Sequence, residues 1–65
     1  MTILITGAFG QLGFSLYKIL KMNSDYKVIR TGRVIPKNNT GINLDIRNSI
    51  QIKEVLQSTQ PDIII

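Results

Sequence analysis

The sequence has 65 residues, with eight Lys and Arg against four Asp and Glu, and therefore a formal net charge of +4. It contains no cysteine and no histidine, which excludes disulfides, cysteine nucleophiles, His-ligated zinc and a Ser-His-Asp triad within this chain. No apolar stretch approaches the roughly 20 residues of a membrane-spanning helix, and no secretory signal is recognisable. We therefore expect one cytoplasmic domain at most, without a membrane partner.

Predicted strands and helices alternate along the first two thirds of the chain. Residues 2–6 form a β-branched and apolar run without clean alternation, which is typical of a strand covered on both faces. A glycine-rich turn follows, and apolar residues at helical spacing predict a helix from about residue 10 to 22. A second strand is predicted at 26–31. A polar loop then leads to a third, short strand at 42–44.

The last third predicts a second helix and the start of a fourth strand. Asn48 can act as the N-cap of this helix, with Gln51 in capping-box position, and Pro61 ends it. Its sheet-facing residues would be Ile52, Val55, Leu56 and Thr59. The fourth strand begins at 63, so we expect residues 1–65 to be the N-terminal part of a longer Rossmann domain, truncated in strand four. The alternative is a small natural domain with a frayed end.

The order β-α-β-β-α-β predicts an α/β fold. With right-handed crossovers it corresponds to the first half of a doubly wound parallel Rossmann sheet, with strand order 3-2-1-4.

The strongest motif is T-G-x-x-G-x-x-G at residues 6–13, placed between the first strand and the first helix. Gly7 would allow the tight turn, Gly10 the approach of a pyrophosphate, and Gly13 close packing of helix on sheet. Free N–H groups at the helix start would then point at the phosphates. The alternative is a glycine-rich turn without a ligand. The predicted cofactor-binding residues here are Gly7, Phe9, Gly10, Gln11, Leu12 and Gly13.

This motif resembles that of the extended short-chain dehydrogenase/reductase superfamily. Residues 10–13 resemble the dTDP-4-dehydrorhamnose reductase-like sugar-nucleotide reductases, and residues 60–65 resemble their fourth strand. By this resemblance, Asp45 and Ile46 would contact the adenine, although Asp45 can also be read as a turn residue. The resemblance implies reduction of a 4-keto nucleotide-sugar with an NAD(P)(H) cofactor, in surface-polysaccharide precursor synthesis such as dTDP-rhamnose formation.

The resemblance also implies a catalytic Tyr-x-x-x-Lys pair beyond residue 65. The one such spacing here, Tyr17 to Lys21, lies inside the first helix, so we assign no catalytic residue and no metal ligand. We expect residues 1–65 alone to be inactive, the nucleotide-sugar to bind through missing C-terminal sequence, and the full-length protein to be compatible with a homodimer. Alternatives are another nucleotide-sugar epimerase or dehydratase, or a non-catalytic regulatory subunit like that of methionine adenosyltransferase.

The end of the second strand bears on the choice of cofactor. An NAD-selective site places an acid there, but residues 29–33 contain Arg30 and Arg33 and no acid. A guanidinium can pair bidentately with a 2′-phosphate, so we predict NADP(H) as the preferred cofactor, with Arg33 as the favoured ligand and NAD(H) still open. The alternative is that both arginines are only solvated. Basic residues cluster between 18 and 37, but without a nucleic-acid motif, so no nucleic-acid partner is expected.

Overall fold

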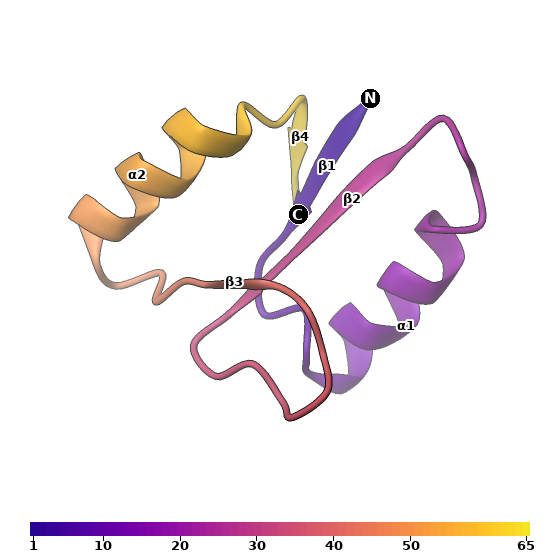
Figure 1. Ribbon diagram of the computed structural model, residues 1–65, viewed down its shortest axis with the longest axis horizontal. Coiled ribbons are helices and arrows are strands. Elements are labelled where there is room, and N and C mark those ends of the chain that lie inside the picture. The colour runs from indigo at the N-terminus through magenta and orange to yellow at the C-terminus, as the bar shows by residue number, and fades with distance from the viewer.

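The structure, a computed structural model, describes all residues 1–65 and contains one four-stranded sheet and two helices (Figure 1). All strand pairs are parallel and the strand order is β3-β2-β1-β4, which confirms the predicted topology. No helix has the length and apolar character needed to cross a bilayer. The elements are β1 (Thr2–Ile5), α1 (Gln11–Leu20), β2 (Lys27–Gly32), β3 (Ile42–Asn43), α2 (Ser49–Thr59) and β4 (Ile63–Ile64).

The two helices cover opposite faces of the sheet (Figure 1), and the central strand β1 supplies both apolar layers. Successive strand residues point to opposite faces, so Ile3 and Ile5 pack on the α1 side while Leu4 packs with Leu44 and Val55 on the α2 side. These three β1 residues are at most 3% exposed. Coverage on both faces explains why this strand is apolar throughout.

Several element boundaries differ from prediction by one or two residues. The first helix ends at Leu20 rather than 22, because the N–H of Met22 donates to the Ile19 carbonyl and closes a tighter turn. The second strand begins at Lys27, because the N–H of Tyr26 is held by the carbonyl of Asn23. The third strand is only two residues long. These shifts leave the order and direction of the elements unchanged.

The start of α2 confirms the predicted N-cap and changes the role of its partner. The side chain of Asn48 accepts a hydrogen bond from the N–H of Gln51 at 3.0 Å. In a full capping box the Gln51 side chain would return to the N–H of Asn48. Instead its Oε1 accepts from the N–H of Asp45 at 2.6 Å. Gln51 therefore fastens α2 to the segment that follows β3.

Candidate functional site

A shallow, open hollow of about 370 Å³ lies at the carboxyl ends of three adjacent strands. In open parallel α/β sheets, ligands bind outside this edge, where the strand order reverses. Here the order reverses around β1, from which the chain runs to β2 and β3 on one side and later returns to β4 on the other. The hollow is lined by Thr6 and Gly7 after β1, Gly32 and Arg33 at and after the end of β2, and Leu44 and Ile46 after β3.

The glycine turn (residues 7–13) joins β1 to α1, and two of its glycines are required by the backbone itself. Gly7 has φ +57°, a left-handed conformation that favours glycine. A Cβ on Gly13 would lie 2.5 Å from the carbonyl oxygen of Gly7 and 2.7 Å from the Cα of Ala8. The close approach of α1 to the end of β1 therefore depends on the absence of a side chain at 13.

Gly10 has no such internal reason to be glycine. A Cβ there would meet only the Gly7 carbonyl oxygen, at an ordinary contact distance of 3.6 Å, and its φ of −79° suits any residue. The space beside Gly10 is therefore open on the outside of the protein. A ligand that approaches the backbone from solvent would need this position to lack a side chain, as the motif predicts for a pyrophosphate.

The start of α1 offers hydrogen-bond donors at the same place. The N–H groups of Gln11, Leu12 and Gly13 have no partner within the chain, no side chain caps the helix, and its first turn contains no acid. Unpaired N–H groups and the helix dipole both favour an anion at this end. Together with the open space at Gly10, these donors fit a diphosphate group.

The Phe9 side chain packs away from the hollow. A Cβ at Gly32 or Gly41 would come within 2.9 or 2.8 Å of its ring, so the ring lies tightly against both glycines. The ring also packs on the apolar cluster beneath α1. Phe9 is not among the residues lining the hollow. The ring thus holds the ends of the β2–β3 loop, and any contact of Phe9 with a cofactor falls to its backbone.

The guanidinium of Arg30 is engaged with its own protein. It lies 4.1 Å from the centre of the Tyr17 ring and 5.2 Å from that of Phe9. It also donates to Oγ1 of Thr40 at 3.1 Å and to Oδ1 of Asn39 at 3.4 Å. Arg30 thereby ties the loop after β2 to α1, and it does not line the hollow.

Arg33 is placed differently. It is exposed, it lines the hollow, and its guanidinium makes no hydrogen bond or ion pair within the chain. A free guanidinium presents a planar set of donors that matches a phosphate. Of the two arginines predicted to bind a phosphate, Arg33 is the one whose donors are available at the hollow.

The segment after β3 brings Asp45 and Ile46 to the same edge of the sheet. Ile46 is 64% exposed and lines the hollow, so its side chain can pack against a planar ring there. Asp45 is paired with Arg47, and hydrogen bonds from Arg47 lower the pKa of its carboxyl from 3.8 to about 2. The pKa of Arg47 is raised in return. Asp45 itself does not line the hollow.

Four functional candidates were missed by sequence reasoning. Thr6, Gly32 and Leu44 line the hollow because each lies at or next to the carboxyl end of a strand. Arg47 holds Asp45, and its position two residues after that acid was the available signal. Placing predicted residues at strand ends on a common edge would have identified the first three.

The family model of the RmlD substrate binding domain matches residues 1–65. The chain belongs to this family. A comparison with curated protein sequences gave no significant match. Among solved structures, the chain is similar to L-threonine dehydrogenase from Clostridium difficile, with a TM-score of 0.76 and 30% identity.

This similarity covers 97% of the chain and 22% of the L-threonine dehydrogenase, so the chain spans less than a quarter of that enzyme's length. The family match and the structural neighbour confirm the predicted relation to the extended short-chain dehydrogenases and reductases, including the sugar-nucleotide reductase branch. They also confirm the predicted first half of a Rossmann-like fold.

Proposed function

We propose that this chain is the NAD(P)(H)-binding segment of a reductase that acts on a 4-keto nucleotide-sugar such as dTDP-4-dehydrorhamnose. The observation that carries the proposal is Gly10, whose missing side chain serves no internal packing and leaves the backbone open beside three free N–H groups. Membership of the RmlD substrate binding domain family supports the substrate class. Similarity to a dehydrogenase supports hydride transfer as the reaction type.

Within this function the chain binds and orients the cofactor, which when bound supplies the hydride. The N–H groups at the start of α1 hold its diphosphate, and Ile46 packs on its adenine. The Asp45 carboxylate is charged at neutral pH, as an aspartate of ordinary pKa is, and can accept a hydrogen bond from the adenine amino group. The catalytic pair and the sugar pocket belong to other parts of the full-length protein, which we place in the cytoplasm without nucleic-acid or membrane partners.

Arg33 supports NADP(H) as the preferred cofactor. Its guanidinium is free at the hollow, and no carboxylate is paired with it. A 2′-phosphate would gain a charge-assisted hydrogen bond that the 2′-hydroxyl of NAD(H) cannot match. NAD(H) remains the second cofactor, bound through the same backbone donors.

The test is the binding of NADPH and NADH to the full-length protein and to its Arg33→Ala variant, by fluorescence titration. A hydrogen bond between charged groups contributes about 1.5 kcal/mol or more, so we expect about a tenfold loss of NADPH affinity. NADH affinity should change little. Lys37→Ala removes the same charge from the same loop without touching the hollow, and it serves as the control. An unchanged ratio of the two affinities in Arg33→Ala would contradict the NADP(H) assignment.

A further inference from the structure

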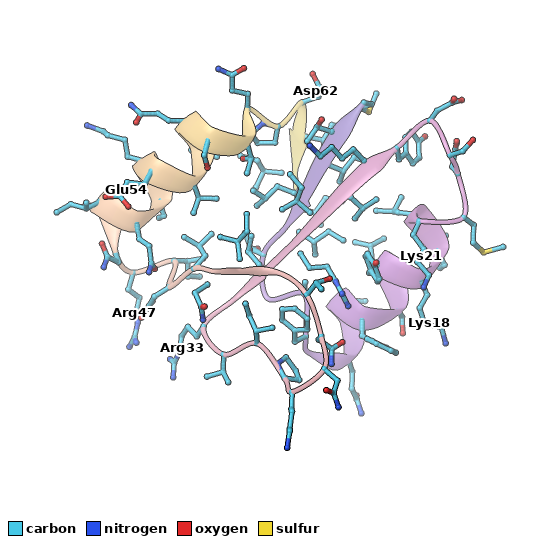
Figure 2. The ribbon with its side chains drawn as sticks, in the orientation of Figure 1. Lys18, Lys21, Arg33, Arg47, Glu54 and Asp62 are labelled. Atoms are coloured by element: carbon cyan, nitrogen blue, oxygen red, sulfur yellow. The ribbon has the colours of Figure 1, made fainter.

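The charged groups around the hollow contain one ion pair and one free arginine. The ion pair joins Asp45 to Arg47 at 2.9 Å and is the only one in the chain. In Figure 2, Arg33 and Arg47 extend from the same edge of the molecule, whereas Lys18 and Lys21 lie on α1 across the sheet. Arg33 follows β2 and Asp45 follows β3, and these strands are paired with Gly32 opposite Asn43, so both residues lie at the same edge of the sheet.

Arg47 holds both oxygens of that acid. Its backbone N–H donates to Asp45 Oδ1 at 2.9 Å, its Nε donates to the same oxygen at 3.1 Å, and its Nη2 donates to Oδ2 at 2.9 Å. The backbone of Asp45 is fixed in turn by Gln51 from α2. A bidentate pair of this kind defines both position and direction of the carboxylate.

Arg33 lies within electrostatic reach of the same carboxylate. After the hydrogen bonds and charge of Arg47, the charge of Arg33 also lowers the pKa of Asp45. The Arg33 guanidinium nevertheless makes no bond to it. In this structure the Asp45 carboxylate is therefore paired with Arg47, while Arg33 acts on it through charge alone.

We propose that Arg47 is a positioning residue for cofactor choice: by holding Asp45, it leaves the Arg33 guanidinium free to bind a phosphate monoester on the ribose of the dinucleotide. The inference rests on the proposed cofactor site. Without Arg47, the Asp45 carboxylate would pair with Arg33, occupy its donors and repel the phosphate. The dinucleotide that lacks this phosphate would be unaffected.

The solvent exposure of the Asp45–Arg47 ion pair limits how far its loss can change the ratio of NADPH to NADH affinity. Arg47 and Asp45 have side chains that are 73% and 33% exposed, and exposed ion pairs change an equilibrium by no more than about fivefold. We expect Arg47→Gln to lower the ratio of NADPH to NADH affinity about threefold at low salt. The change should shrink in about 1 M salt, where charges are screened over about 3 Å.

The experiment compares NADPH and NADH binding to the full-length protein and four variants. These are Arg47→Gln, Asp45→Asn, the double variant Arg47→Gln/Asp45→Asn, and Lys53→Gln. Lys53 is exposed on α2 and touches neither arginine nor Asp45, so its variant controls for the loss of one charge. The readout is the affinity ratio, which an adenine contact of Asp45 does not affect because both cofactors share the adenine.

The expected result is a lower ratio in Arg47→Gln, restoration by the added Asp45→Asn, and no change in Lys53→Gln. If Arg47 had only a structural role, Arg47→Gln would lower the affinities for NADPH and NADH together. The added Asp45→Asn would then not restore them. An unchanged ratio in Arg47→Gln, or a lowered ratio that Asp45→Asn does not restore, overturns the inference. An unchanged ratio in Arg33→Ala would instead overturn the phosphate site on which it rests.

A second measurement needs no cofactor. In Arg47→Gln, NMR titration of the Asp45 carboxyl should still find a pKa below 3.8, because the backbone N–H of residue 47 still donates to it and the charge of Arg33 acts beside that hydrogen bond. Adding Arg33→Gln should then raise the pKa of Asp45 further, but not fully to its ordinary value, because the backbone hydrogen bond from residue 47 remains. If Arg33→Gln does not change the pKa of Asp45 in the Arg47→Gln background, the side chains of Arg33 and Asp45 do not interact and the inference is wrong.

Discussion

The glycine turn (residues 7–13) and the arginine-bearing segment that runs from the start of β2 to Arg47 meet at one hollow by different physical means. The turn acts through its backbone: Gly7 provides a left-handed conformation, Gly13 lets α1 approach, and the helix start leaves three N–H groups free. The segment acts through side chains, of which Arg30 and Arg47 are engaged and Arg33 is free. Backbone shape is fixed by local spacing, whereas the availability of a charge depends on its neighbours.

The largest effect, a loss in the free energy of unfolding, is expected from Gly13→Ala, which introduces a steric clash within the glycine turn. Alanine improves helix propensity by about 1 kcal/mol, but its Cβ would lie 2.5 Å from a backbone oxygen that cannot rotate away. We expect a net loss of about 1–3 kcal/mol in the free energy of unfolding, as for other overpacked sites. Urea denaturation measures it. Stability equal to wild type would mean that α1 does not need to lie so close to β1.

Gly10→Ala is the matched variant and separates packing from ligand binding. The new Cβ meets only one atom, at 3.6 Å, so the free energy of unfolding should stay within about 0.5 kcal/mol of wild type. Dinucleotide affinity should fall at least tenfold, or about 1.4 kcal/mol, for NADPH and NADH alike. Titration of both cofactors provides the measurement. Normal binding by this variant would remove the observation on which the proposed function depends.

Arg30→Ala tests whether the two arginines have different roles. It removes the contact with the Tyr17 ring and the bond to Thr40, and such a partly exposed cation–π contact contributes about 0.5–1 kcal/mol. We expect that loss in urea denaturation, with the NADPH to NADH affinity ratio unchanged. Arg30→Lys keeps the charge without the planar group and should recover only part of the stability. A changed cofactor ratio in Arg30→Ala would show that Arg30 also contacts the phosphate.

The smallest expected effect is on the free energy of unfolding at acid pH, where protonation of Asp45 removes its contribution. Its pKa is lowered from 3.8 to about 2 in the folded state, chiefly by hydrogen bonds from Arg47. This contribution is therefore present above about pH 4 and is lost as the pH falls towards 2. The urea midpoints of wild type and Asp45→Asn should differ near pH 5 and converge near pH 2. A difference that is constant over this range would show that the ion pair does not form in solution.

Most of the fold could be predicted from the sequence because its signals are local. The spacing of three glycines between an apolar run and an amphipathic segment predicted strand, turn and helix, and Asn48 marked the start of α2. Element ends were less predictable. Tyr26 suits a strand, but its N–H is taken by a turn, a competition between hydrogen bonds that propensity does not decide.

The candidate site was predictable in the glycine turn and less so elsewhere. The sequence placed Arg30 and Arg33 three residues apart near the end of the second strand, and Arg33 was favoured as the phosphate ligand without a contact to distinguish the two. The structure separates them: one guanidinium lies on Tyr17, and the other lines the hollow. Phe9 likewise lies inside the predicted motif, yet its ring packs against Gly32 and Gly41, the two ends of a loop that lies far from Phe9 in the sequence.

The sequence by itself determined the parallel β-α-β architecture and the family, because backbone conformation and apolar periodicity act over a few residues. The roles of individual charges were decided only by the tertiary structure. Arg33 comes near the locally formed Asp45–Arg47 pair because parallel strands bring their carboxyl ends to one edge of the sheet. Electrostatic interactions and hydrogen bonds depend on the distance between the groups. Arg33 and Asp45 come close enough to interact only when β2 and β3 are paired.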